Sequence, residues 1–578
     1  MTFIAGIDVG NATTEVLLAR VPDGPDGPDG PDGPDGPDGP VGPVEVIGVG
    51  RAPTRRAKGS PESLAGAVAV VRRLERQHAV RVDRAVAAPL RPVVTSRASL
   101  PEEVPDLGRL ALVAAGSGTA GGTGFGAGRP VLLGEVPSEG EPVVAVVPSG
   151  TGFAAAAARL APLVEAGRVV AVLAEADEGV LLANRLPGGV PVVDEIDPGR
   201  ALAAERVAVE VAGDGQPMRV LPDPLRLRAA LGLGEEELVD AAQLARLLFD
   251  ATNAVVTVGG RVAAVTAVAA APTGWMDLAG DRLPFVEGLA RVRAERVGAV
   301  SAYAVPPDHE TRAVDDLWAL DLAAVAAAVQ ARVGAASRRP VTLASLRASA
   351  PYADPADRLA GLLEVPVRTV DTEARAARAG AMSTPGVGTG AVVVDLGGGT
   401  IDAVSPDGDV VAAGAGDLLT ESVAALTGIT AAAAEWVKRG PAYRVEAPQV
   451  LLAEDGTRTF QDRPAPPEAI GRLVASGPAG LLPFSASLAP GEWRALRIRL
   501  KVEHVGGNVA RALRTLGADP RSVVVVGGLA GDDEILAAVA GALPSSTAVG
   551  RGDVAGTLGH RYAVAYGLVV LDAANNER

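Results

Sequence analysis

Two stretches far apart in the chain each place an aspartate, a glycine turn and a threonine between two apolar strands. The first is "GIDVGNATTEV", residues 6–16, and the second is "VVVDLGGGTIDAV", residues 392–404. In each, small residues let backbone N–H groups approach a polyphosphate closely. The aspartate, Asp8 or Asp395, ends a strand where a hydrated magnesium ion would bind. Two such hairpins facing each other predict a clamp around the phosphates of a nucleotide.

A third segment strengthens this interpretation. In "VVVVGGLAGDDEI", residues 523–535, Gly527 and Gly528 end a buried strand and leave room for a flat ring against the backbone. Either hairpin alone would be interpreted as an ordinary Asp-Gly turn, whereas the three segments together favour a nucleotide site. Another glycine-rich pattern, "GSGTAG" at 116–121, matches G-x-G-x-x-G, the fingerprint of dinucleotide-binding folds. The sequence "GTGFGAGRP" follows it and predicts a flexible loop in place of a pyrophosphate-binding helix.

The amino-acid composition limits which cofactors and partners the chain could have. The chain has 578 residues, a formal net charge of −16, four histidines and no cysteine. Carboxylates and hydroxyls are therefore the expected metal ligands, and hard cations such as magnesium suit them. The acidic balance argues against nucleic acid, which would need a basic surface. No signal-peptide pattern precedes Asp8 and no apolar run reaches the ~18 residues of a membrane span. We therefore expect a cytoplasmic protein without a membrane partner.

Short Val/Ile/Leu runs alternate with Ala-rich helical patterns, which is typical of an α/β fold. Buried strands are expected in "PVVAVVP", "RVVAVLAEA", "GAVVVDLG" and "SVVVVGGLAG". A long amphipathic helix is expected in "DLWALDLAAVAAAVQARVG", residues 316–334. Six PDG triplets, residues 22–39, lie between two strand-like segments, so we expect a solvated hairpin loop and assign it no function.

In order and spacing, the three glycine-rich segments resemble the actin/Hsp70/sugar-kinase ATPase fold. The resemblance implies that Asp8 and Asp395 hold magnesium through water and that Gly527 and Gly528 pack on adenosine. It assigns the phosphate contacts to Asn11, Ala12, Thr13, Gly397, Gly398, Gly399 and Thr400. Glu373, in "DTEARAARAGAM", would orient the attacking water. The helix in "EWVKRG" would cover the adenosine through Glu435, Trp436, Val437 and Lys438. For Glu373 and for this helix, an ordinary surface charge is the alternative interpretation.

Longer segments resemble the large subunit of the diol/glycerol dehydratase reactivating factor over essentially the whole chain. They are "FIAGIDVGNATTEVLLA", "TAGGTGFGAG", "EADEGVLLANRL", "VPVVDEID", "GAVVVDLGGGTIDAV" and "VGRGDVAGTLGHRYAVAYGL". This resemblance implies an ATP-dependent chaperone that releases damaged cobalamin from an inactivated adenosylcobalamin-dependent dehydratase. It implies ATP/ADP and Mg²⁺ as cofactors and a nucleotide contact at Arg561. It also implies a heterotetramer with a small subunit, and a second metal held at that contact by Thr119, Asp177 and Asp194.

The expected architecture is a duplicated, ribonuclease H-like ATPase core with an inserted swivelling domain and a smaller insert domain. Its limits are 1–90, 253–444 and 518–578 for the core, 91–252 for the swivelling domain and 445–517 for the insert. Two other functions on the same fold stay open, a small-molecule kinase and a filament-forming actin-like ATPase. The client dehydratase could act on glycerol, on propane-1,2-diol or on both.

Overall fold

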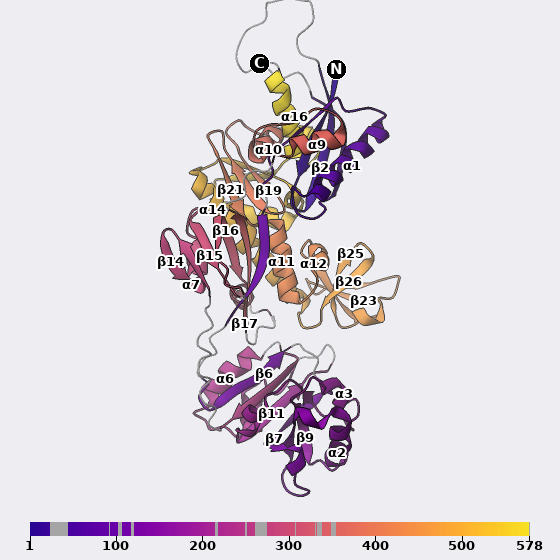
Figure 1. Ribbon diagram of the computed structural model, residues 1–578, viewed down its shortest axis with the longest axis vertical. Coiled ribbons are helices and arrows are strands. Elements are labelled where there is room, and N and C mark those ends of the chain that lie inside the picture. The colour runs from indigo at the N-terminus through magenta and orange to yellow at the C-terminus, as the bar shows by residue number, and fades with distance from the viewer. Residues whose placement is uncertain are drawn as a thin grey trace, which may run out of the picture.

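The structure is a computed structural model. It describes residues 1–22, 44–91, 93–101, 107–116, 121–213, 218–248, 251–259, 274–306, 308–329, 331, 338–347 and 354–576. Within these ranges the strands form five sheets, and helices cover them (Figure 1). The expected PDG loop lies outside the described residues apart from Pro22. No helix in the described ranges is both long enough and apolar enough to span a membrane.

Two five-stranded sheets share one topology, β3-β2-β1-β4-β18 and β21-β20-β19-β27-β28. In each, an antiparallel three-stranded meander continues into two strands that run parallel to its first strand. This repetition confirms the expected duplicated α/β core. The first sheet contains β1 (Thr2–Val9), β2 (Thr13–Val21), β3 (Glu45–Pro53), β4 (Arg84–Ala87) and β18 (Val367–Thr369). The second contains β19 (Val392–Leu396), β20 (Thr400–Val404), β21 (Asp409–Ala413), β27 (Ser522–Val526) and β28 (Ala548–Arg551).

Helices fill both faces of the first sheet and connect it to the second. α1 (Pro61–His78) and α9 (Ala356–Leu363) pack on one face, and α10 (Glu373–Ala381) and α16 (Ala563–Asn576) pack on the other. α10 and α16 also contact the second sheet. The two helices cross closely because Gly380 and Gly567 face backbone: a Cβ on Gly567 would lie 1.8 Å from the Ala376 carbonyl oxygen.

A six-stranded antiparallel sheet, β14-β13-β15-β16-β17-β5, packs against the second core sheet through Trp318 and Leu320. The helix expected at 316–334 was wrong in its first part, because residues up to Asp321 form a strand. The Asp321 side chain then accepts a hydrogen bond from Ala324 N and begins a short helix. The strands are β5 (Val93–Pro101), β13 (Trp275–Leu278), β14 (Asp281–Pro284), β15 (Val300–Ala304), β16 (Arg312–Asp321) and β17 (Arg338–Arg347). The helices are α7 (Phe285–Val292) and α8 (Leu322–Ala328).

Between β21 and β27 the chain adds helices on the second core sheet and a small antiparallel sheet, β24-β23-β22-β25-β26. The helices are α11 (Gly416–Thr427), α12 (Ala431–Val437), α13 (Pro490–Lys501) and α14 (Gly507–Leu516), with α15 (Asp533–Gly541) following β27. A π-helix, Val502–Gly506, joins α13 to α14. The strands are β22 (Ala442–Ala447), β23 (Val450–Ala453), β24 (Arg458–Phe460), β25 (Leu473–Gly477) and β26 (Gly480–Ser485).

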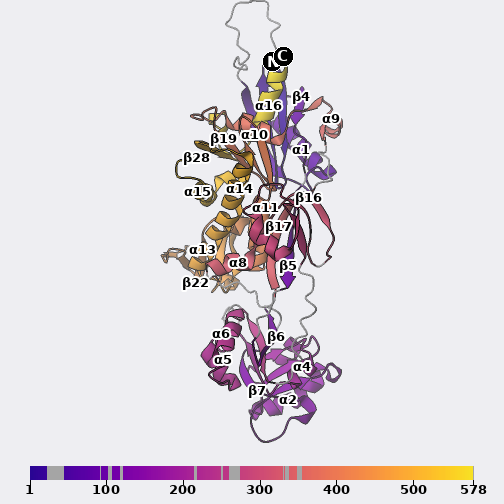
Figure 2. The same cartoon turned by 90° about the vertical axis from the view of Figure 1, so that its left-hand side faces the viewer.

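A seven-stranded sheet, β10-β9-β8-β7-β11-β12-β6, forms a separate unit at one end of the molecule in both views (Figures 1 and 2). Its strands are β6 (Leu110–Gly116), β7 (Gly124–Leu132), β8 (Val143–Val147), β9 (Val169–Ala174), β10 (Val192–Val193), β11 (Arg206–Val211) and β12 (Asn253–Val258). Its helices are α2 (Phe153–Glu165), α3 (Gly179–Ala183), α4 (Pro198–Leu202), α5 (Pro224–Leu231) and α6 (Leu238–Leu247).

Two features of this unit differ from the sequence expectations. The expected glycine-rich loop is in fact the strand β7, and its glycines allow the backbone of β9 to approach closely. A Cβ on Gly126 would lie 2.1 Å from the Val170 carbonyl oxygen. The limits 91–252 also assign two whole strands to the other unit: β5 pairs with β17 of the six-stranded sheet, and β12 pairs with β11 of the seven-stranded sheet.

Candidate active site

The two glycine hairpins meet at a cleft of about 390 Å³ between the core sheets. Both turns close with the same hydrogen bond, from Gly10 N to the Thr13 carbonyl and from Gly397 N to the Thr400 carbonyl, each 3.1 Å long. The turns also touch each other. A Cβ on Gly399 would lie 2.4 Å from Asn11 Nδ2 and 2.9 Å from Val93 Cβ, so a side chain there would displace these neighbours. Every residue expected to contact phosphate lines the cleft, namely Asn11, Ala12, Thr13, Gly397, Gly398, Gly399 and Thr400.

Carboxyl groups gather on the cleft floor. Asp8 and Asp395 lie one residue before the ends of β1 and β19 and line the cleft with Glu15, the cross-strand partner of Asp8. Asp402, the cross-strand partner of Asp395, is buried outside the cleft lining. Burial, together with the nearby Glu373 carboxylate, raises the pKa of Asp395 to about 7 and raises the pKa values of Asp8 and Asp402 well above their usual range. Several carboxyl groups that are buried close together do not ionise readily unless a cation neutralises their charge. The site therefore fits a hard divalent cation.

Lys58 places a positive charge among these carboxyl groups. Its Nζ donates to Glu373 Oε2 at 2.6 Å, although the two residues are 315 positions apart. Burial alone would lower the pKa of Lys58, but Glu373 and Asp8 outweigh this effect and raise it. The ion pair therefore fixes one oxygen of Glu373, while the carboxylate remains in the cleft lining.

Few protein side chains would bind the expected magnesium ion directly. Within the described residues, no three carboxylate or imidazole groups gather so as to hold a metal ion. Mg²⁺ commonly retains several waters and binds through one or two carboxylates and the substrate phosphates. The arrangement of Asp8 and Asp395 suits that mode of binding.

Arg561 lines the cleft and is held there by a buried carboxylate, that of Glu15. Its Nη1 donates to Glu15 Oε1 at 2.7 Å, and the Tyr562 backbone N–H donates to Glu15 Oε2 at 2.9 Å. The guanidinium lies beside Gly528, where an added Cβ would be 3.6 Å from Arg561 Nη1. Gly527 N donates to the His560 carbonyl at 2.8 Å, which fixes the turn after β27. Gly527, Gly528 and Arg561 all line the cleft.

The helix α12 contributes only part of what was expected. Lys438 Nζ donates to the Gly416 carbonyl at 2.9 Å and contacts Glu435 Oε2 at 2.5 Å, and both side chains line the cleft. Val437 instead lies in the hydrophobic core, and Trp436 is partly exposed beside Arg439. Neither Trp436 nor Val437 lines the cleft. The physical reason is helical periodicity, which turns only one face of α12 toward the cleft.

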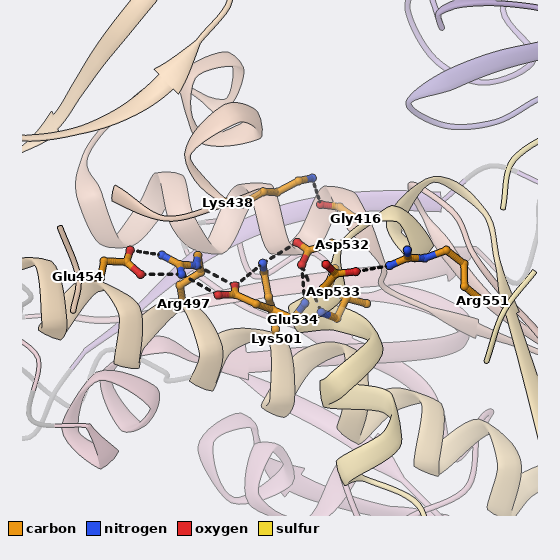
Figure 3. Close-up of polar contacts among 10 residues, drawn as sticks. Gly416, Lys438, Glu454, Arg497, Lys501, Asp532, Asp533, Glu534 and Arg551 are labelled. Atoms are coloured by element: carbon orange, nitrogen blue, oxygen red, sulfur yellow. Dashed lines mark hydrogen bonds and ion pairs between the residues drawn. The ribbon is translucent and has the colours of Figure 1, made fainter. Parts of the chain in front are cut away.

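An ionic network lies behind the cleft wall (Figure 3). Asp532, which lines the cleft, contacts Lys501 Nζ at 2.5 Å, and Lys501 contacts Glu534 at 2.7 Å. Arg497 then contacts Glu534 at 2.7 Å and Glu454 at 2.5 Å. Arg497 and Lys501 are both buried. The network ties the cleft wall to the small antiparallel sheet.

Several cleft residues were not predicted from the sequence, among them Glu15, Lys58, Asp417 and His560. One signal could have found two acidic residues: Glu15 and Asp402 stand at the same offset from Asp8 and Asp395 within the repeated hairpins. Lys58 lies in a basic segment with no repeated pattern and could not be found in this way.

Two of the three residues expected to hold a second metal, Asp177 and Asp194, lie in the seven-stranded unit. Asp194 Oδ2 accepts a hydrogen bond from Gly179 N, at the start of α3, at 2.7 Å. Asp177 is exposed two residues earlier in the chain than Gly179. Thr119 lies outside the described residues. This set therefore stays a prediction.

Comparison with known proteins identifies the relatives of the chain. The model of the family "diol dehydratase reactivase ATPase-like domain" matches residues 277–572, and that of the "DD-reactivating factor swiveling domain" matches residues 111–261. The propanediol dehydratase-reactivating factor large subunit of Citrobacter freundii is 29% identical over 622 aligned positions, covering 99% of this chain and 98% of the relative. The diol dehydratase-reactivating factor large subunit of Klebsiella michiganensis is also 29% identical, with the same coverage.

Solved structures agree with these relatives. The diol dehydratase-reactivating factor in nucleotide-free form has a TM-score of 0.62 and 26% identity, covering 99% of this chain and all of the other. The glycerol dehydratase reactivase has a TM-score of 0.61 at the same identity and coverage. The resemblance and the fold class inferred from the sequence are confirmed. The chain therefore belongs to the family of large subunits of the diol dehydratase-reactivating factor.

Proposed function

We propose that this chain is the ATPase subunit of a chaperone that restores inactivated adenosylcobalamin-dependent diol or glycerol dehydratase. In this role it releases the damaged cobalamin so that fresh coenzyme can bind. One observation carries the ATPase part of the proposal: two hairpins whose turns close with the same hydrogen bond meet at buried carboxyl groups in one cleft. Family membership supports the dehydratase as client. We expect the cycle to take place in the cytoplasm.

The residues of the cleft have distinct tasks in this proposal. Backbone N–H groups of the two turns bind the phosphates, and the wall formed by Gly527 and Gly528 binds adenosine. Asp8 and Asp395 would hold Mg²⁺ through water, and the ion would neutralise phosphate charge. Glu373, fixed by Lys58, orients the attacking water.

The proposed exchange of cofactor is a switch between binding partners. In one nucleotide state the chain binds its small subunit, within a heterotetramer, and in the other it docks on the inactivated dehydratase. Such a switch requires the nucleotide to bind the two assemblies with different affinity. We assign the contact with the small subunit to the seven-stranded unit, where Thr119, Asp177 and Asp194 would bind a second divalent cation.

The direct test is rescue of an inactivated dehydratase. Glycerol-inactivated dehydratase is mixed with this chain, its small subunit, ATP, Mg²⁺ and free adenosylcobalamin, and aldehyde formation is followed with glycerol and with propane-1,2-diol. We expect recovery that requires ATP. Recovery without ATP, or none with either dehydratase, would contradict the proposal.

Variants separate the ATPase site from the partner contact. Asp8→Ala or Asp395→Ala should abolish ATP hydrolysis with the fold intact, whereas Asp407→Ala, at an exposed turn of the same sheet, should not. Asp177→Ala should weaken binding of the small subunit in size-exclusion chromatography without removing hydrolysis. Normal turnover in the Asp8 and Asp395 variants would reject the assigned site.

A further inference from the structure

Three backbone hydrogen bonds join the phosphate-binding turn Gly397–Gly399 to a neighbouring segment, residues 414–417. Gly414 N donates to the Gly399 carbonyl at 2.8 Å, Gly416 N to the Gly397 carbonyl at 3.2 Å, and Asp417 N to the Gly398 carbonyl at 2.8 Å. Each peptide carbonyl of the glycine turn is thus bound by the segment 414–417, which connects β21 to α11. The position of this segment consequently determines the position of the turn.

Buried side chains hold the connecting segment in place. Asn508 Nδ2 donates to the Ala413 carbonyl at 2.8 Å and to the Gly414 carbonyl at 3.0 Å. His504 Nε2 lies 2.8 Å from the Ala415 carbonyl. Both side chains are fully buried, and neither lines the cleft. They therefore act on the turn only through the backbone of residues 413–415.

The direction of the histidine hydrogen bonds follows from its partners. Trp318 Nε1 lies 3.1 Å from His504 Nδ1, and an indole N–H can only donate. Nδ1 must therefore accept, so Nε2 carries the proton and donates to the Ala415 carbonyl. Burial lowers the pKa of His504 to about 4, which keeps this neutral tautomer at physiological pH.

A second buried group orients Asn508. Arg511 Nε donates to Asn508 Oδ1 at 3.0 Å, so the amide must direct its NH₂ group toward the two carbonyls. Arg511 is paired in turn with Asp316 at 2.6 Å, and Asp316 also accepts from Ala413 N at 2.8 Å. The backbone of Ala413 is thus bound on both sides by one connected network.

The helix that carries these residues has an unusual turn at this place. Residues 502–506 form a π-helix, and Gly506 faces the backbone of α15, where an added Cβ would lie 2.6 Å from the Ala538 carbonyl oxygen. Single π-turns within α-helices are rare and occur often near functional sites. This turn brings His504 and Asn508 to three successive carbonyls.

We infer that His504 and Asn508 are positioning residues that set the conformation of the phosphate-binding turn Gly397–Gly399 without touching the nucleotide. The inference depends on the proposed nucleotide site only because ADP and adenosine are the ligands used to detect a displaced turn. A misplaced turn would weaken binding of phosphates but would leave the adenosine wall at Gly527 and Gly528 unchanged.

The experiment compares ADP with adenosine, by calorimetry on the full chain. His504→Phe replaces the imidazole with a planar ring that can neither donate to the Ala415 carbonyl nor accept from Trp318 Nε1. Asn508→Asp keeps the shape but replaces the donor with an acceptor. Each should weaken ADP binding by about tenfold or more, the equivalent of at least one lost hydrogen bond, while adenosine affinity stays within about threefold. His504→Gln, which can donate again, should recover most of the ADP affinity. Thr342→Val, which removes a buried hydrogen bond to Ser422 elsewhere in the core, should leave the ADP-to-adenosine ratio unchanged.

Amide hydrogen exchange provides a readout that needs no ligand. In the nucleotide-free protein, residues 397–400 and 414–417 should exchange faster in His504→Phe and Asn508→Asp than in the wild type or in Thr342→Val. An unchanged exchange rate together with an unchanged ADP-to-adenosine ratio would overturn the inference. A wild-type chain that binds neither ligand would reject the proposed function instead, and the exchange rates would still decide the role of His504 and Asn508.

Discussion

The backbone of Gly527 lies directly against the carboxylate of Asp395: a Cβ added to Gly527 would stand 2.1 Å from Asp395 Oδ1. Gly527 also has a φ of +89° and a ψ of 177°, a conformation that is essentially restricted to glycine. Two independent constraints thus require glycine where the adenosine wall meets the proposed magnesium site. This contact couples the two halves of the proposed nucleotide site.

The first prediction follows from that contact. Gly527→Ala should displace Asp395 or the turn after β27 and weaken binding of Mg²⁺–ATP by at least about tenfold. Gly550→Ala, on β28 of the same sheet and outside the cleft lining, is the matched control, because its Cβ would meet nothing within 4 Å. Titration calorimetry of both variants checks this. Equal losses in the two variants would mean that the contact with Asp395 is not the cause.

The second prediction concerns the Lys58–Glu373 ion pair. Lys58→Met should lower the rate of ATP hydrolysis by about 100-fold or more, because Glu373 loses the partner that orients it. If the two residues act as a unit, the Lys58→Met/Glu373→Gln double variant should be no slower than the slower single variant. Arg375→Met, at an exposed position on α10, the helix that carries Glu373, serves as the control. Additive effects on kcat would contradict this role.

The hairpins could be predicted from the sequence because their chemistry is local. A turn such as Gly10–Thr13 is specified by adjacent small residues, and the same turn recurs at Gly397–Thr400. The buried strands β8, β9, β19 and β27 were also predicted, because continuous β-branched runs bounded by turn residues indicate them.

The errors arose where tertiary packing overrides local preference. Residues 316–321 have helical spacing but extend as β16, because Trp318 and Leu320 are buried between two sheets. Glycines of β7 serve close strand packing, which no local pattern reveals. Lys58 reaches Glu373 across 315 positions, and that contact depends on the assembled core.

The third prediction tests the network of Figure 3. Arg497→Met should destabilise the chain by about 3–5 kcal/mol, because Glu454 and Glu534 would lose their shared partner while Lys501 stays buried. Arg458→Met removes a similar double contact with Glu446 on an exposed strand and should change stability little. Denaturant unfolding of both variants measures the difference. If Arg497→Met and Arg458→Met lose a similar free energy of unfolding, burial does not determine how much these ion pairs stabilise the chain.

The last prediction uses His504 as a pH probe of the core. Its folded-state pKa of about 4 lies below the ordinary value of 6.5, so the unfolded chain binds a proton over this range and the folded chain does not. The stability contributed by neutral His504 is therefore complete above pH 6.5 and is lost as the pH falls toward 4, by about 3 kcal/mol in total. His504→Gln should remove this part of the pH dependence, and His78→Gln, at the exposed end of α1, should retain it. Tryptophan fluorescence during denaturant unfolding can follow the effect, because Trp318 and Trp493 are buried in the same core as His504. If wild type and His504→Gln lose stability equally between pH 6.5 and pH 4, then His504 is not held neutral by this core.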